Sequence, residues 1–237
     1  YIGAEEYGPS ILKFNFNGNL ISRWIPKKSK KTEDSITVNA LPEILSLRSP
    51  NRGFEGIACN GEMVYAILQS PLKFPKEYEI KNPDIKKQIL ITSLNTETNT
   101  VTGIYSFLLD DEQIDKIGDI QYLKDKKFVL IEQNSEHGKK AVHKIVEIDL
   151  KNATNLLPLI KKSNDAITQL KILDEQFSKI THVTKTLIVD LAQEGWDYSA
   201  KIEGIAVLDN GDIAIINDND FAMWDEKNSY LGIYKTK

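Results

Sequence analysis

One pattern occurs three times in this chain: an apolar segment with an acid near its start, a turn, and a second apolar segment that ends in amides or acids. The three copies occupy residues 53–70, 117–134 and 201–219. Their opening acids are Glu55, Asp119 and Glu203. The residue after the second segment follows its acid by 14, 14 and 15 positions, at Gln69, Gln133 and Asp218. A recurring unit of this kind indicates a repeat architecture.

The apolar segments of each copy are expected to be β-strands, because they are short, rich in Ile, Val, Tyr and Phe, and separated by turn residues. Asn-Gly pairs, which suit tight hairpin turns, stand at 17–18, 60–61 and 210–211. Further strand-like segments follow the copies, at 87–94 and 101–108, at 141–150 and 185–191, and at 232–235. Four antiparallel strands per unit predict an all-β fold, a β-propeller of four-stranded antiparallel blades.

The first residues of the chain fit the same scheme as part of an earlier blade. Residues 1–6 are expected to form its second strand, and 11–16 and 19–24 its outer hairpin. The chain then supplies about three and a half blades, whereas a closed ring needs about four to eight. We therefore expect residues 1–237 to form a single propeller domain, the C-terminal portion of a longer protein. A helical pattern at 153–177 predicts an insertion in this domain.

Composition narrows the classes of partner. Charged residues make up 27% of the chain with a net charge of −4 and no basic stripe, which argues against a nucleic-acid partner. No apolar run approaches the roughly 20 residues of a membrane span. Cys59 is the one cysteine, so no internal disulfide is available.

The repeated acids carry the functional prediction. In a propeller the first strand of each blade lines the central channel, so the three opening acids are expected to converge at its mouth. Acids and amides at the corner after the second strand would join them. A ring of carboxylates repels itself unless a cation sits within it, and Ca²⁺ prefers about six to eight oxygen ligands. The sequence thus predicts a Ca²⁺ site with the ligands Glu5, Glu6, Glu55, Asp119, Glu132, Glu203 and Asp218.

A structural role for the same acids is equally open. A Glu before Gly at a strand start accepts backbone N–H groups well, and such contacts would lock neighbouring blades together. Asp218 and Asp220, in Asn-Asp-Asn-Asp, also suit a turn in which the side chain bonds its own backbone.

Arg52, just before Glu55, is the candidate phosphate ligand, because arginine binds phosphate with two parallel hydrogen bonds. Pairing of Arg52 with an acid of the ring is the alternative. The three histidines show no metal-ligand spacing, and no Gly-x-Ser-x-Gly motif indicates a serine hydrolase.

Six motifs in order resemble the phytase-like family, described as "esterase-like activity of phytase". They are Glu-Glu-Tyr-Gly-Pro-Ser at 5–10 and the segments 51–58, 66–72, 129–132, 201–206 and 217–221. Members are typically bacterial, often exported and usually longer at the N-terminus. The resemblance therefore implies a periplasmic or secreted protein.

By the same resemblance, Ca²⁺ would hold phosphate and activate water, with cations at Glu5, Glu6, Glu55, Glu132, Glu203 and Asp218 and phosphate at Arg52. Glu55, Glu203 and Arg52 are the expected catalytic residues. Relatives tend to have Glu-Arg where this chain has Glu132-Gln133, which removes one cationic group.

Two functions remain open at this point. One is a Ca²⁺-dependent hydrolase of small phosphate or carboxylic esters. The other is a non-catalytic propeller that binds a ligand or a protein and uses its acids structurally.

Overall fold

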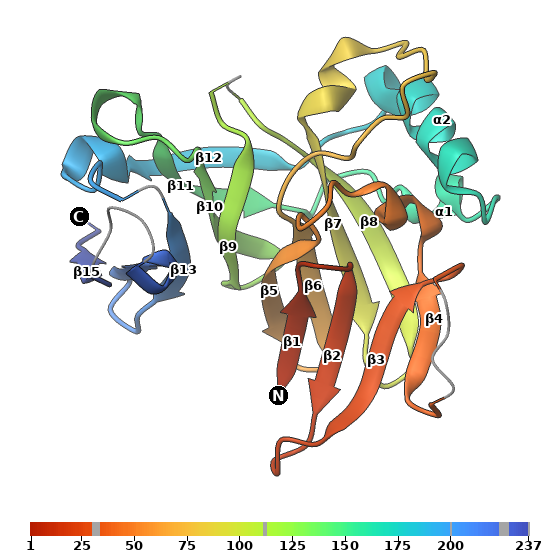
Figure 1. Cartoon of the computed structure of the whole chain (residues 1–237), viewed down its shortest axis with the longest axis horizontal. Helices are drawn as coiled ribbons and strands as arrows, with labels where there is room; N and C mark the ends of the chain where they lie inside the picture. The colour runs from red at the N-terminus through yellow and green to blue at the C-terminus, as the bar shows by residue number, and fades with distance from the viewer. Residues whose placement is uncertain (30–33, 111–112, 200, 223–227, 237) are drawn as a thin grey trace. The chain divides into compact units, whose positions relative to one another are not determined.

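The computed structural model describes residues 1–29, 34–110, 113–199, 201–222 and 228–236. It is an all-β structure of four open sheets with short helices between the strands (Figure 1). The chain divides into two compact units. Unit 1 comprises residues 1–108 and 152–183, and unit 2 comprises residues 109–151 and 184–237.

The first sheet of unit 1 has the order β1-β2-β3-β4. Its strands are β1 (Ile2–Glu5), β2 (Ser10–Phe14), β3 (Leu20–Pro26) and β4 (Thr37–Leu41). The first three are antiparallel, as predicted, but β4 pairs with β3 in parallel. Strand β4 was not foreseen, because a parallel neighbour is reached through a long connection rather than a hairpin turn.

The second sheet of unit 1 is a four-stranded antiparallel meander. It contains β5 (Phe54–Asn60), β6 (Met63–Leu68), β7 (Gln88–Asn95) and β8 (Thr100–Leu108). Gly61 joins β5 to β6 with a φ of 58°, a left-handed conformation that glycine adopts without steric cost. The Asn-Gly pair thus makes the predicted hairpin.

Unit 1 also contains helical segments, some between its strands and the others in residues 152–183. They are η1 (Glu43–Leu47), η2 (Pro83–Lys87), α1 (Leu157–Ile160), α2 (Ala166–Gln176) and η4 (Phe177–Lys179). Asp165 caps α2, because its carboxylate accepts the Thr168 N–H at 2.9 Å. Both α-helices fall within the range 153–177 where the sequence shows a helical pattern.

Unit 2 contains the other two sheets, of orders β12-β11-β10-β9 and β13-β14-β15. The first consists of β9 (Lys116–Tyr122), β10 (Lys127–Gln133), β11 (His143–Asp149) and β12 (Thr184–Asp190). The second consists of β13 (Ile202–Val207), β14 (Ile213–Asn217) and β15 (Leu231–Tyr234). Short helices η3 (Gly138–Lys140), η5 (Leu191–Glu194) and η6 (Asp220–Ala222) complete the unit. All strand pairs in it are antiparallel.

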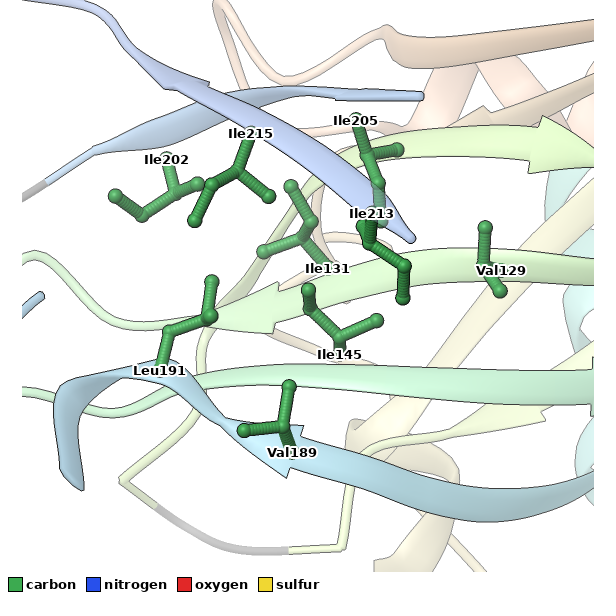
Figure 2. Packing of buried hydrophobic residues seen from close by; sticks show 9 residues of the cluster. All are labelled: Val129, Ile131, Ile145, Val189, Leu191, Ile202, Ile205, Ile213 and Ile215. Atoms are coloured by element: carbon green, nitrogen blue, oxygen red, sulfur yellow. The ribbon is translucent and has the colours of Figure 1, made fainter. Parts of the chain in front are cut away.

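The two sheets of unit 2 share an aliphatic core. Figure 2 shows side chains of β10, β11 and β12 pointing toward those of β13 and β14. The buried members are Val129, Ile131, Ile145, Val189, Leu191, Ile202, Ile205, Ile213 and Ile215. Burying each such side chain contributes on the order of 1.5–3 kcal/mol. Val129 and Ile131 of β10, and Ile213 and Ile215 of β14, are two residues apart in their strands and therefore point to the same face, into this layer.

The open sheets agree with the β units that the repeats predicted. Closure of such sheets into a propeller ring, and a single domain over 1–237, stay predictions. Among the described residues no helix is long and apolar enough to cross a membrane.

Candidate functional site

A β-bulge lies at each of the three repeated acids. In β5, Phe54 pairs with Leu68 and Gly56 with Ile67, which leaves Glu55 as the extra residue. Glu203 is the extra residue of β13 in the same way, between Ile202 and Gly204. In β9, Gly118 and Asp119 oppose a single residue of β10. Bulges redirect side chains and are common next to functional sites. The acids therefore share a backbone feature as well as a position in the repeat.

In unit 1, an amide joins two of the predicted metal ligands. The buried Gln69 donates through Nε2 to Oε1 of Glu6 at 3.0 Å, and the same nitrogen donates to Oε2 of Glu55. One amide nitrogen thus lies between two carboxylates. The predicted corner residues Glu6 and Gln69 and the bulge residue Glu55 form one cluster, which we call the Glu6–Gln69–Glu55 cluster.

Gly53 holds the backbone of this cluster together. Its N–H donates to the Glu6 carbonyl at 2.6 Å, and its own carbonyl accepts the Gln69 N–H at 2.8 Å. A Cβ at Gly53 would lie 2.3 Å from the Glu6 carbonyl oxygen, so only glycine allows this approach. The Gly53 backbone fixes the distance between the chain segments that carry the two acids.

Glu5 has different partners from Glu6, because the side chains of successive residues in an extended strand point to opposite faces. Its carboxylate accepts the Gly8 N–H and the Ser10 hydroxyl, each at 3.0 Å, and lies 3.7 Å from the Arg23 guanidinium. These contacts close the turn between β1 and β2.

Arg52 lies half-buried in the turn before β5, where its N–H donates to the Ser49 carbonyl at 3.1 Å. Within the described ranges its guanidinium has no ion-pair partner.

In unit 2, Asp119 binds the backbone. Its two carboxylate oxygens accept the N–H groups of Ile120, at 2.8 Å, and of Ile205 on the neighbouring sheet, at 3.0 Å. Burial nevertheless raises the pKa of Asp119 to about 6. Gln133 accepts the Ile202 N–H at 2.8 Å, and Gln121 accepts that of Val207. Three side chains of the β9–β12 sheet thus accept backbone N–H groups of β13, the first strand of the other sheet in unit 2. This is the structural role that the sequence left open for the acids.

Glu203 lies among charges of both signs. Burial raises its pKa to about 7, against the lowering effect of Lys116 and Lys201, and the hydrogen-bonded Asp218 raises it further. The Lys201 ammonium lies 2.6 Å from Asp220 and 3.9 Å from Asp218. Asp218 also accepts the Asp220 N–H at 2.9 Å, as expected of a turn residue. The site thus combines the carboxyl group of Glu203, with a pKa of about 7, and the ammonium of Lys201, which neutralises Asp218 and Asp220.

Glu132 is fully buried in unit 2 and paired with Lys185 at 2.6 Å. Lys185 also lies 3.1 Å from Asp110. Burial raises the pKa of Glu132, and its Oε2 has no hydrogen-bond partner among the described residues. Lys185 thus supplies positive charge beside Glu132, and the role of Glu132 as a metal ligand stays a prediction.

The predicted cation site can be compared with the oxygen ligands that each of these acids still offers. The Glu6–Gln69–Glu55 cluster offers two carboxylates and an amide, all oxygen ligands of the type that Ca²⁺ prefers once the amide is turned over. Glu5, Asp119, Glu132 and Asp218 already accept backbone or ammonium groups. Among the described residues no group of three or more His, Cys, Asp or Glu side chains is placed to hold a metal. The seven-ligand site stays a prediction.

Sequence reasoning did not anticipate the bulges, nor that Lys185 and Lys201 neutralise Glu132, Asp218 and Asp220. The Glu-Gly pairs at 55–56 and 203–204 carried a signal for the bulges, because glycine inside a strand often marks one.

A family model described as "Phytase-like: Esterase-like activity of phytase" matches residues 1–221. The chain belongs to the phytase-like family. The match covers the three repeated acids Glu55, Asp119 and Glu203, the Arg52 turn and the helical segments of unit 1. No curated protein and no solved structure shows a significant match to this phytase-like chain.

Proposed function

We propose that this phytase-like protein is a Ca²⁺-dependent hydrolase of small phosphate esters. The observation that carries the proposal is the Glu6–Gln69–Glu55 cluster, in which one neutral amide lies between two carboxylates. Two negative charges so close together favour a divalent cation between them. Family membership supports hydrolysis of an ester as the reaction class.

The residues of unit 1 have separate roles in this proposal. Glu6 and Glu55 hold the cation, and Gln69 turns its amide oxygen toward it. Bound Ca²⁺ supplies positive charge for phosphate oxygens and for activation of water. Arg52, whose guanidinium has no ion pair with the residues that the structure describes, binds further phosphate oxygens through two parallel hydrogen bonds.

Glu203 belongs to unit 2, and its catalytic role stays a prediction of the sequence. A pKa of about 7 suits a group that takes and returns a proton near neutral pH, because both forms are then populated. The neighbouring Lys201 and Asp218 adjust this pKa in opposite directions.

The first test is Ca²⁺ binding by calorimetry, with Glu55→Gln and with Glu62→Gln as the matched control. Glu62 is an exposed residue of the β5–β6 turn. We expect Glu55→Gln to weaken Ca²⁺ binding by about tenfold or more, because ligand charge sets Ca²⁺ affinity, and Glu62→Gln to leave it unchanged. Equal affinities in all three proteins would place the cation elsewhere.

The second test is hydrolysis of p-nitrophenyl phosphate with Ca²⁺ and after its removal by a chelator. Turnover should require Ca²⁺ and should fall in Arg52→Lys, which keeps the charge but loses the two-pronged contact. Ca²⁺ binding without any turnover would reject the hydrolase and retain the cation site.

A second candidate function, a non-catalytic binding protein, is favoured by one observation. Asp119, Gln121 and Gln133 use their side chains to hold the neighbouring strand β13. Turnover separates the two functions, because only the hydrolase should cleave p-nitrophenyl phosphate in the presence of Ca²⁺. In a non-catalytic binding protein we expect no turnover, and Asp119→Asn should lower stability at every Ca²⁺ concentration, because Asp119 holds backbone N–H groups.

A further inference from the structure

A pocket of about 230 Å³ lies in unit 1, away from the Glu6–Gln69–Glu55 cluster. It is lined by β4, the start of β8 and the helices α1 and α2. Helix α1 packs against β8, and α2 packs against η1 and α1 (Figure 1). None of the residues proposed for ester hydrolysis lines this pocket.

The wall of the pocket is mostly apolar. Ala40, Val101, Leu157 and Ile160 contribute aliphatic surface. Gln169, which also lines it, is buried with its amide already satisfied: it accepts the Ile44 N–H at 2.7 Å and donates to Ser163 O at 2.7 Å. The interior therefore offers hydrocarbon contact rather than polar recognition.

Two lysines stand in the lining of this apolar pocket. Lys27 donates to the neutral Asn164 amide at 3.1 Å, and Lys161 is exposed directly after α1. Neither ammonium has a carboxylate partner among the residues that the structure describes. A hydrocarbon cavity with unpaired positive charge at its rim complements a molecule with an apolar body and an anionic head.

The volume limits the size of that molecule. Drug-sized ligands occupy pockets of roughly 300–1,000 Å³, so this one suits a smaller compound. We propose that the pocket binds a short aliphatic chain with a single anionic oxygen group, its chain against Val101, Leu157 and Ile160 and its head at Lys27 and Lys161. A free carboxylate and an alkyl phosphate share this chemistry.

The test is calorimetric titration of the whole chain with octanoate, octyl phosphate and the uncharged 1-octanol. We expect both anions to bind several-fold more tightly than the alcohol. The ratio of the octanoate and octyl phosphate affinities identifies the preferred head group. Equal binding of 1-octanol and both anions would overturn the proposal, because the lysines would then contribute nothing.

Two matched pairs of variants locate the binding site. Leu157→Trp fills the pocket, whereas Leu159→Trp adds the same side chain to α1 outside the lining. Lys161→Glu reverses the rim charge, whereas Lys162→Glu reverses its neighbour's. We expect Leu157→Trp to weaken octanoate binding about tenfold or more. Lys161→Glu should weaken it about threefold, the range of one exposed ion pair.

Unchanged affinity in Leu157→Trp, or equal effects of the two lysine reversals, would refute binding at this pocket. Ala40→Leu serves as a second filling variant should Leu157→Trp fold poorly, since Ala40 is only half-buried and lines the pocket from β4. Melting curves of each variant without ligand establish that the fold is retained.

Discussion

At the scale of the residue, Glu203 shows how burial and charge compete at one carboxyl group. Burial raises its pKa to about 7 from an ordinary value near 4.5. An acid whose pKa is raised in the folded state stabilises the fold fully below its unfolded pKa, and this contribution is lost as the pH rises through the folded pKa. Stability from Glu203 therefore falls between about pH 4.5 and about pH 7.

Glu203→Gln tests this linkage, because the amide cannot ionise. We expect the free energy of unfolding of the variant, relative to the wild type, to increase from about pH 5 to about pH 8 by on the order of 1–3 kcal/mol. Urea denaturation at both pH values measures it. Glu194→Gln, an exposed site in the same unit, is the control. A difference independent of pH would mean that Glu203 has an ordinary pKa.

At the scale of the element, Asp174 of α2 holds the loop before η2. The buried carboxylate accepts the N–H groups of Lys81 and Asn82, both at 2.9 Å, and the Tyr78 hydroxyl at 3.1 Å. Burial, followed by the hydrogen bond to Asp174, raises the pKa of Tyr78. One side chain thus fixes a segment that has no strand partner of its own.

Asp174→Ala should lower the free energy of unfolding by about 2–4 kcal/mol, since it leaves two backbone donors without an acceptor. Limited proteolysis should then cut between residues 70 and 82. The adjacent Glu175→Ala is the control, because Glu175 is exposed and bonds only the Lys81 ammonium among the described residues. Equal resistance of both variants would show that the loop is held by other contacts.

The elements also show what local sequence determines. Asn-Gly pairs between short apolar segments rich in Ile, Val, Tyr and Phe predicted the hairpins, since these signals act over a few residues. The parallel β4 and the pairing of Lys185 with Glu132 depend on contacts between distant parts of the chain, which no local pattern encodes. The repeat located Glu6, Glu55 and Gln69, but their common hydrogen bonds arise from the approach of Gly53 to Glu6.

At the scale of the whole molecule, the chain forms two compact units. In unit 2, a layer of aliphatic side chains lies between the two sheets (Figure 2). Ile131 belongs to this layer and is fully buried. Ile131→Ala should cost about 2–5 kcal/mol, because it removes buried methylene groups and leaves a cavity. Since the side chains packed around Ile131 come from both sheets of unit 2, both sheets should loosen together.

Hydrogen exchange measures this directly. In Ile131→Ala we expect faster exchange across β9–β11 and β13–β14, with the largest change in the strands that supply the core residues. Leu187→Ala, at an exposed position of β12, is the matched control and should leave the exchange rates of these strands unchanged. Faster exchange confined to β10 would show instead that the two sheets open separately. The layer would then join them without making them one cooperative unit, and the acids of β9 and β13 would respond to mutation independently.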